Sequence, residues 1–273
     1  MKFPVALQLY SVRDFMERDF EGTLRRVAAM GYDGVEFAGT FGRTAAKVRD
    51  LCEACGLVPV SAHVPLAEMQ ADPQGVIRYY KQVGCAHLVI PYLPEDRRAG
   101  TPGFEETLAF AASFGAMVTA SGMTLQYHNH DFEFVRLGDE YALDYIYRTV
   151  PADCLQTQID TCWARVGGVD PAAYIRQYAG RAPTVHLKDY SGTKSEKMYA
   201  LIGLDDSGDT AAGSSAFRLR PCGMGCQDFA AILAASRQAG TGWMIIEQDT
   251  VSDGLTSLQC AEKSLAYIQT INK

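Results

Sequence analysis

Eight short β-rich runs recur along this chain, and most of them are followed by a stretch with the periodicity of an amphipathic helix. Strands that alternate with helices are typical of a parallel sheet, because parallel neighbours need a crossover connection. The β-rich runs cover residues 5–12, 34–37, 57–64, 87–92, 124–131, 155–163, 184–188 and 243–248. The helical patterns cover residues 20–30, 44–54, 72–83, 104–121, 143–150, 170–178, 228–239 and 258–271.

The number of these units favours closure of the sheet into a barrel. The 273 residues are close to the ~250 of a typical (β/α)₈ barrel, and an open doubly wound sheet is the alternative. No linker or change of composition divides the chain, so we predict one α/β domain over residues 1–273, a TIM barrel. A polar insertion at 191–220 follows the seventh run, and we expect a lid or specificity segment there, or a subunit contact.

Composition narrows the class of protein and its partners. Hydrophobic residues make up 48% and charged residues 21%, which is typical of a globular domain. The net charge of −7 disfavours nucleic acid as a partner. No run reaches the ~18 apolar residues of a membrane helix, and the N-terminus lacks the features of a signal peptide, so we expect a cytoplasmic protein without membrane contact. The sequence leaves the oligomeric state open, a homo-oligomer included.

The eight cysteines are expected to be reduced and packed as small apolar side chains. Cys52 and Cys55 form a C-x-x-C, but they lie in a helical pattern and no second pair has the spacing of a zinc ribbon. We therefore predict no zinc or redox role for this pair.

Polar residues gather where the β-rich runs end, and in a barrel these carboxyl ends meet at one rim. Several carboxylates at one rim repel each other unless a cation lies among them. Carboxylate and imidazole together suit Mn²⁺, Co²⁺, Zn²⁺ or Mg²⁺, so we predict one divalent ion. The rim residues are Glu36, His63, His128, His130, Glu133, Asp160, His186, Lys188, Glu247 and Asp249, of which Asp249 is expected to be a cap or loop former.

Four motifs on these runs resemble the xylose isomerase-like superfamily of barrels, usually labelled sugar phosphate isomerase/epimerase. They lie at 127–134 (YHNHDFEF), 159–163 (IDTCW), 185–189 (VHLKD) and 245–249 (IIEQD). The resemblance covers nearly the whole chain and is specific for the superfamily, not for a substrate. The related three-zinc DNA-repair enzymes carry a histidine where this chain has Trp163, so a three-metal nuclease site is not expected.

The resemblance implies metal ligands on strands five to eight, usually Glu, Asp, His and Glu. Asp160, His186 and Glu247 carry over directly. On strand five this chain has His-Asn-His in place of Glu-x-His, so the first ligand is either His128 or Glu133. Glu133 is slightly favoured, because a third carboxylate better matches a hard divalent ion.

The resemblance also implies a sugar isomerase or epimerase that removes a proton next to a carbonyl while the metal stabilises the enediolate. Glu247 and His130 are the expected acid–base groups, and Lys188 is expected to neutralise the oxyanion. A dehydratase or lyase acting on a keto-sugar, keto-glycoside or cyclitol, as in inosose dehydratase-like relatives, is the first alternative. A sugar-binding barrel without catalysis is the second. The expected substrate contacts are Glu36, His63, His128, Trp163 and Arg218, although Glu36 and His63 also suit simple ion-pair or hydrogen-bond roles.

Overall fold

Eight parallel strands form a closed barrel in the computed structural model, which describes residues 2–194 and 217–273. The strands are hydrogen-bonded in the order β1, β12, β9, β8, β5, β4, β3, β2, so the first and last strands close the barrel. This confirms the predicted single-domain TIM barrel. The strands are β1 (Val5–Gln8), β2 (Gly34–Ala38), β3 (Val58–His63), β4 (His87–Ile90), β5 (Thr124–His128), β8 (Gln156–Asp160), β9 (Thr184–Leu187) and β12 (Trp243–Ile246).

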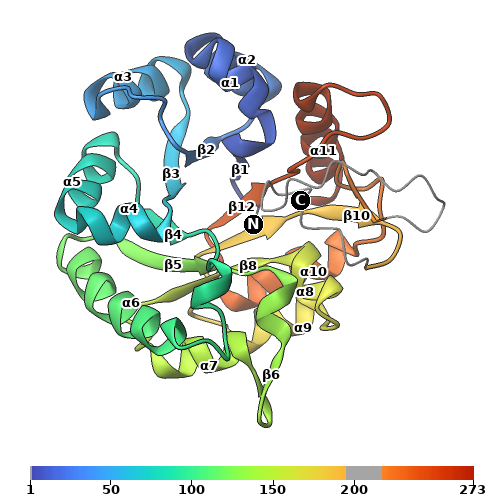
Figure 1. The fold of residues 1–273 in the computed structure, drawn as a ribbon. Coiled ribbons are helices and arrows are strands. Elements are labelled where there is room, and N and C mark those ends of the chain that lie inside the picture. Colours follow the sequence, from blue (N-terminus) through green and yellow to red (C-terminus); the bar gives the residue numbers. More distant parts are fainter. Residues whose placement is uncertain (1, 195–216) are drawn as a thin grey trace.

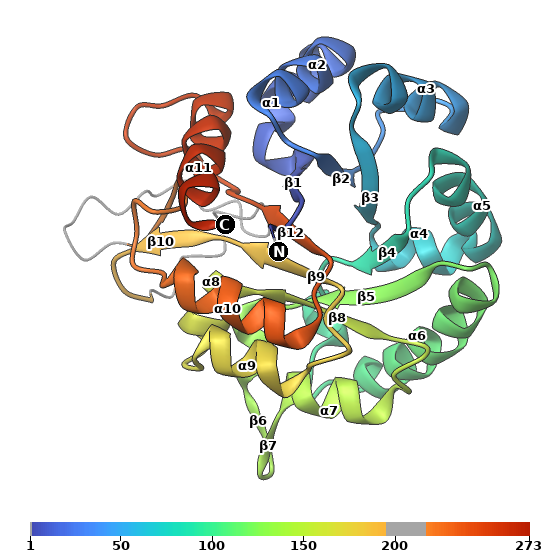
Figure 2. The ribbon, with the colours of Figure 1, turned by 180° about the vertical axis from the view of Figure 1, so that it is seen from behind.

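Helices surround the strands on the outside, as Figures 1 and 2 show from opposite sides. Their ends follow local sequence signals. Asp19 and Asp72 cap α2 and α5 by accepting hydrogen bonds from backbone N–H groups, and Gly31 and Gly84 end these helices with positive φ angles of 97° and 103°. The long helices are α2 (Phe20–Met30), α3 (Ala45–Cys55), α5 (Pro73–Val83), α6 (Gly103–Ala120), α7 (Ala142–Thr149), α9 (Pro171–Gln177), α10 (Phe229–Ala239) and α11 (Ser257–Ile271).

Several short elements follow the strands and were not expected from the sequence. The first and sixth β-rich runs end early, because a 3₁₀ helix starts at Leu9 and a helix starts at Thr161. A hairpin of β6 (Arg136–Leu137) and β7 (Glu140–Tyr141) projects from the body in Figures 1 and 2. The other short elements are η1 (Leu9–Val12), α1 (Arg13–Arg18), α4 (Leu66–Ala71), η2 (Glu95–Arg97), η3 (Asp131–Phe134) and α8 (Thr161–Val166).

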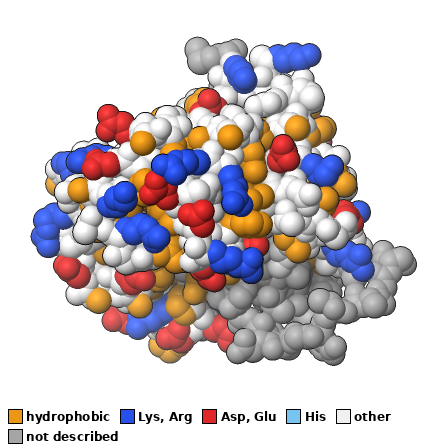
Figure 3. All heavy atoms as spheres, turned by 90° about the horizontal axis from the view of Figure 1, so that it is seen from above, with side chains coloured by type: hydrophobic (Ala, Val, Ile, Leu, Met, Phe, Trp, Pro, Cys, Tyr) orange, Lys and Arg blue, Asp and Glu red, His pale blue; other side chains and the backbone are white. Residues whose placement is uncertain are grey.

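The predicted lid at 191–220 lies mostly outside the described residues. Only its ends are described, where β10 (Asp189–Ser191) pairs antiparallel with β11 (Arg218–Arg220). In the part of the chain that is described, no helix is both long and apolar enough to cross a membrane. On the face in Figure 3, acidic and basic side chains are interspersed among the described residues. The cysteines are free, and Cys52 and Cys55 lie in α3 as expected.

The inside of the barrel changes from apolar to polar along its axis. Ala6, Val60 and Ile245 form an apolar cluster, and the residues two further along from Ala6 and Ile245 are the polar Gln8 and the charged Glu247. The register between β2 and β3 shifts between Val35 and Glu36, which leaves Val60 as an extra residue on β3. Such irregularities redirect side chains next to functional sites. Here both Val60 and Ser61 reach the interior, where the Ser61 hydroxyl donates to Glu36 at 2.6 Å.

Candidate active site

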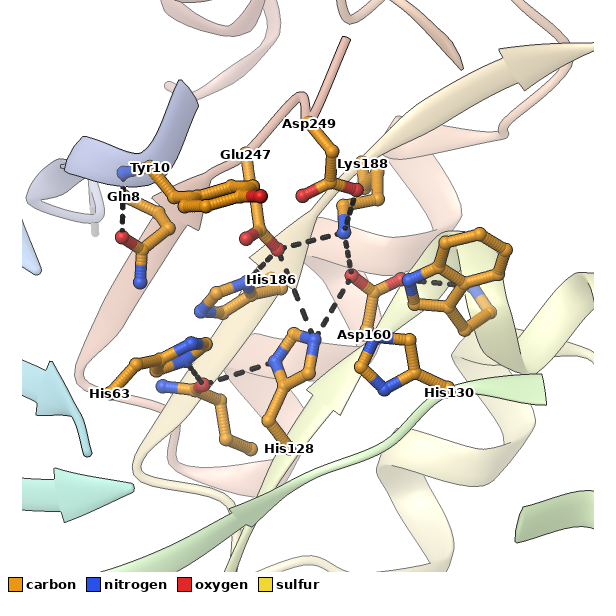
Figure 4. A network of polar contacts seen from close by, with 12 residues as sticks. Gln8, Tyr10, His63, His128, His130, Asp160, His186, Lys188, Glu247 and Asp249 are labelled. Atoms are coloured by element: carbon orange, nitrogen blue, oxygen red, sulfur yellow. Dashed lines mark hydrogen bonds and ion pairs between the residues drawn. The ribbon is translucent and has the colours of Figure 1, made fainter. Parts of the chain in front are cut away.

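A pocket of about 400 Å³ opens at the carboxyl ends of the strands. Its volume suits a small organic ligand. Strand ends supply its polar floor, and the segments that follow the strands supply its walls. Figure 4 shows the floor, where side chains at or just beyond the ends of β3, β5, β8, β9 and β12 point toward one another. The lining residues are Tyr10, Ala38, Gly39, His63, Pro65, Glu68, Tyr80, Pro91, Tyr92, His128, His130, Lys188, Glu247 and Asp249.

Four predicted rim residues from consecutive strands converge at this floor. His128, Asp160, His186 and Glu247 each offer one ligand atom, and these atoms lie within 4.8 Å of one another. His128 Nε2 is 3.7 Å from Asp160 Oδ2 and 3.9 Å from Glu247 Oε2. Asp160 Oδ2 is buried and accepts no hydrogen bond from any described residue. Two carboxylates and two imidazoles in this arrangement fit a divalent transition metal.

Lys188 brings a positive charge against the same carboxylates. Its Nζ lies 2.8 Å from Glu247 Oε2, 2.9 Å from Asp249 Oδ2 and 3.3 Å from Asp160 Oδ2. Burial opposes this charge, yet the three carboxylates raise the pKa of Lys188 well above its usual range. Burial raises the pKa of Asp249 to about 6. Asp249, expected to be only a cap or loop former, is therefore a buried partner of Lys188.

Glu247 is ionised in this environment. Burial alone would raise its pKa, but Lys188 and His186 lower the pKa of Glu247 well below its usual range. His186 Nδ1 donates to Glu247 Oε2 at 2.9 Å, and its Nε2 donates to Glu36 Oε1 at 2.8 Å. Burial opposes a charged ring, but Glu36 and Glu247 raise the pKa of His186 to about 10. A cation held by Nδ1 would replace the proton there, as in any metal-bound histidine.

Glu36 was expected to contact the substrate or to serve a simple pairing role, and the structure places it away from the surface of the pocket. Its side chain is 0% exposed, it does not line the pocket, and it lies behind His186. Gln8 and Gln158 donate to its two oxygens at 2.7 and 2.6 Å. This arrangement, in which a carboxylate holds the far nitrogen of a candidate metal ligand, fixes the orientation of the imidazole.

The side chain of Gln158 fixes the orientation of the His128 imidazole in the same way. Because its amide nitrogen donates to Glu36, its Oε1 is the acceptor for His128 Nδ1 at 3.1 Å and for His63 Nε2 at 2.7 Å. His128 therefore carries its proton on Nδ1 and presents the lone pair of Nε2 to Asp160 and Glu247. Burial lowers the pKa of His128 well below its usual range, so the ring is neutral and able to act as a ligand.

Glu133, the slightly favoured strand-five ligand, lies outside this group. Its oxygens accept hydrogen bonds from the Tyr127 hydroxyl at 2.6 Å and from His130 N at 2.7 Å. Burial raises the pKa of Glu133 to about 8. The geometry therefore favours His128 over Glu133 as the strand-five ligand.

His130 and His63 line the pocket as expected, whereas Trp163 and Arg218 do not. His130 stacks on Phe132 with ring centroids 5.1 Å apart, and burial lowers its pKa well below the usual range. Trp163 is fully buried behind His130, so it supports the pocket wall without forming its surface. Arg218 is exposed on β11.

Contributors to the site that sequence reasoning did not find include Gln8, Tyr10, Glu68 and Gln158. The sequence could have pointed to Gln8 and Gln158, because the side chain of each lies on the inner face of its strand. The neighbouring strands end in the predicted rim residues. Gln158 is two residues before Asp160, and side chains two apart on a strand share a face. Tyr10 follows β1 in the unexpected 3₁₀ helix η1, so no strand pattern pointed to it.

Comparison with known proteins places the chain in a family. A family model described as xylose isomerase-like TIM barrel matches residues 24–271. The chain therefore belongs to the xylose isomerase-like TIM barrel family, which confirms the resemblance seen in its motifs. No curated protein sequence matches the chain.

Solved structures with the same fold carry different activities in their names. A sugar phosphate isomerase/epimerase from Parabacteroides distasonis is 20% identical, with a TM-score of 0.74 over 100% of this chain and 96% of that one. D-allulose 3-epimerase from Methylomonas sp. is 14% identical, with a TM-score of 0.69 over 98% of each chain. A probable 3-DHS dehydratase from Bacillus anthracis is 11% identical, with a TM-score of 0.73 over 98% of this chain and 99% of that one. At these identities the likeness shows the shared fold and does not select a reaction.

Proposed function

We propose that this protein is a metal-dependent isomerase or epimerase that removes a proton next to the carbonyl of a sugar. The observation that carries the proposal is the convergence of His128, Asp160, His186 and Glu247 at the floor of a pocket. The family includes proteins named as sugar isomerases and epimerases, which supports a carbohydrate substrate.

The proposed metal ligands are these four residues, with His128 in place of the family's glutamate. Two imidazoles favour a transition metal such as Mn²⁺, Co²⁺ or Zn²⁺ over Mg²⁺, which prefers oxygen ligands. When bound, the ion would polarise the substrate carbonyl as a Lewis acid and stabilise the negative charge that develops as the proton leaves. Glu36 and Gln158 would hold the two imidazoles in position from behind.

Glu247 is the proposed base. It lines the pocket, is ionised, and its carboxylate is held by Lys188 at 2.8 Å and His186 at 2.9 Å. Such a positioned carboxylate can take a proton from the carbon next to the carbonyl. Lys188 lies beside it and can neutralise charge on a substrate oxygen. His130, neutral and on the pocket wall, is the proposed partner that returns or transfers a proton.

Solvent deuterium exchange tests this proposal directly. We expect the metal-loaded protein to incorporate deuterium next to the carbonyl of at least one ketose or keto-glycoside, and a chelator to abolish the incorporation. Substitution Glu247→Gln or His130→Ala should lower the exchange rate roughly 10²- to 10⁴-fold, as for removal of a general acid or base. Sugar binding without exchange in any substrate would favour the non-catalytic alternative.

A dehydratase is the second candidate, and the strand-five histidines favour it. His128 occupies the position of the usual glutamate, and His130 adds a second acid–base group on the pocket wall. In that reaction Glu247 would remove the α-proton, and that proton, relayed through neutral His130, would leave with the β-hydroxyl as water. Formation of an unsaturated carbonyl, followed by its ultraviolet absorbance, separates this outcome from isomerisation.

A further inference from the structure

The charges that line the pocket are mostly negative. Glu68, Glu247 and Asp249 contribute three carboxylates, whereas Lys188 is the one permanent cation among the described lining residues. Lys188 is 1% exposed and already lies 2.8 Å from Glu247 and 2.9 Å from Asp249. Its charge is therefore balanced within the protein. Glu68 is exposed on α4, so its charge faces an incoming ligand.

Arg13 contacts two lining residues of the pocket but does not itself line the pocket. Arg13 follows Tyr10 and donates from one nitrogen to the carbonyl oxygens of Tyr10 and Asp249, at 2.9 and 2.7 Å. Its guanidinium carbon lies 4.0 Å from the centre of the Tyr10 ring. The guanidinium thus holds the wall formed by Tyr10 in place and joins it to the segment after β12.

Other cations on the loops of this face are also engaged elsewhere. Arg98, beyond the wall residue Tyr92, stacks 3.7 Å from the centre of the Phe132 ring and donates to the carbonyl of Leu93 at 2.9 Å. Arg43 lies 4.2 Å from the centre of the Phe20 ring, and Lys194 pairs with Asp131 at 2.6 Å.

The remaining wall is aromatic and apolar. Tyr10, Tyr80 and Tyr92 with Pro65 and Pro91 present flat carbon-rich surfaces and phenol groups. Such walls suit the carbon face and hydroxyl groups of a polyhydroxylated ring. They provide none of the bidentate guanidinium or clustered ammonium contacts with which proteins recognise a phosphate monoester.

We propose that this pocket selects an uncharged carbohydrate, such as a free ketose or keto-glycoside, and rejects the corresponding phosphate monoester. The inference rests on the proposed function, because it concerns the substrate of the same site. A phosphate monoester carries about −1.5 to −2 charges at pH 7. Apart from the proposed metal ion, which would bind the carbonyl end of the substrate, it would meet the exposed carboxylate of Glu68 at the pocket with no described arginine or free lysine to compensate. The "sugar phosphate" in the name of a structural neighbour therefore does not extend to this chain.

Paired ligands test this selectivity. We would measure the affinity of the Mn²⁺-loaded protein at pH 7.5 by calorimetry for D-fructose and D-fructose 6-phosphate, and for D-ribulose and D-ribulose 5-phosphate. We expect each phosphate ester to bind at least 10-fold more weakly than its parent sugar in 0.1 M salt. The difference should shrink in 1 M salt, where the Debye length falls from about 10 to 3 Å. An ester that binds as tightly as its parent sugar overturns the proposal.

Charge reversal at the mouth of the pocket gives a second test. Substitution Glu68→Lys should improve the relative affinity for the phosphate ester at least threefold. The matched control is Glu53→Lys, which makes the same charge change at an exposed position in α3 away from the pocket lining. An equal effect of both substitutions would contradict a local electrostatic origin.

Inorganic phosphate is a probe that needs no sugar to bind. With the metal chelated, we expect 10 mM phosphate at constant ionic strength to leave the melting temperature unchanged. Phosphate-dependent stabilisation that disappears in Arg218→Met would reveal an anion site and overturn the proposal.

Deuterium exchange then separates this inference from the proposed function. If a phosphate ester exchanges faster than its parent sugar, the reaction class stands and the selectivity is wrong. If nothing exchanges while the esters and phosphate are still rejected, the selectivity stands and the reaction class is wrong.

Discussion

The orientation of two histidine rings in this site depends on hydrogen-bond acceptors that lie behind them. Glu36 and Gln158 occupy the interior of the barrel, where branched apolar side chains usually pack. Their oxygens accept from His186 Nε2 and His128 Nδ1, which leaves the opposite nitrogen of each ring facing the pocket floor. Buried polar groups of this kind are costly unless every partner is present, so each contact here is specific.

Substitution Glu36→Gln tests the role of the carboxylate behind His186. We expect the affinity for Mn²⁺ or Zn²⁺ to fall 10- to 100-fold, the range typical when such supporting partners are lost. Calorimetric titration gives the affinity, and ¹⁵N chemical shifts of the His186 ring report its tautomer. The control is Ser61→Ala, which removes a donor to the same carboxylate without touching His186. Unchanged metal affinity and an unchanged tautomer in Glu36→Gln would refute the assigned role.

His87 gives a prediction about pH and stability away from the site. Burial lowers its pKa to about 4, against a value of about 6.5 in an unfolded chain. As the pH falls, His87 is therefore protonated at a higher pH in the unfolded chain than in the folded protein. The stability contributed by neutral His87 is complete above about pH 6.5 and is lost as the pH falls toward 4, by up to ~1.4 kcal/mol per pH unit.

Urea unfolding at several pH values checks this behaviour. In His87→Asn, which can still hydrogen-bond to Thr124, the free energy of unfolding should vary less between pH 6.5 and 4 than in the wild type. Parallel curves for the two proteins would show that His87 does not titrate in this range.

At the scale of strands and helices, the sequence predicted the order and nearly all positions of the long elements. Alternation of β-rich and helical runs, Asp caps and terminal glycines are local signals, and they were sufficient for the fold. The predicted ends of the strands were less accurate, because helix capping depends on the direction of a side chain. Asp160 caps α8 by accepting a hydrogen bond from Trp163 N at 2.9 Å, so β8 ends at Asp160, three residues before the predicted end of the sixth run.

The sequence predicted the rim residues of the candidate site, but it did not predict how other side chains hold these residues in position. His128, Asp160, His186 and Glu247 were all named, since polar residues at strand ends are conspicuous. The position of Glu36 behind His186 and the turning of Glu133 toward Tyr127 depend on long-range contacts and on the register shift before Glu36. No local pattern contains that information.

Helix α6 offers a test of close packing between elements. A Cβ added at Gly115 would lie 1.9 Å from the carbonyl oxygen of Cys154, which is far inside contact distance. Gly115→Ala should therefore destabilise the protein by about 1–3 kcal/mol through overpacking. This cost is expected to exceed the gain of ~1 kcal/mol that alanine brings to a helix interior.

Chemical denaturation measures the change in the free energy of unfolding. The control is Ala116→Gly at the next, exposed position of α6, which should lose only the helix propensity of alanine. Greater stability of Gly115→Ala than of the wild type would contradict the proposed contact.

For the molecule as a whole, the two ends of the described chain are joined at the seam where the barrel closes. The side chain of Asn272 accepts a hydrogen bond from Phe3 N and donates one to Phe3 O, both at 2.9 Å. The Tyr32 hydroxyl adds a bond to the carbonyl of Ala261 in α11 at 2.8 Å. These contacts hold α11 beside β1, the strand that pairs with β12.

Removal of the Asn272 amide should weaken this closure. Asn272→Ala leaves the backbone N–H and carbonyl of Phe3 without their partners in a buried setting, and we expect a loss of about 2 kcal/mol in the free energy of unfolding. Thermal and urea unfolding measure it, with exposed Lys273→Ala as the control. Equal stability of the two variants would mean that water replaces both hydrogen bonds.

The division of the pocket between strands and connecting segments has a consequence for the diversification of this protein. The residues that converge at the floor come from strand ends, whereas Tyr10, Glu68 and Tyr92 come from segments outside the barrel. Insertions and exchanges are tolerated in such segments far better than in paired strands. Changes in these segments, by selection or by design, could therefore alter the ligand preference of the pocket while the residues at its floor stay the same.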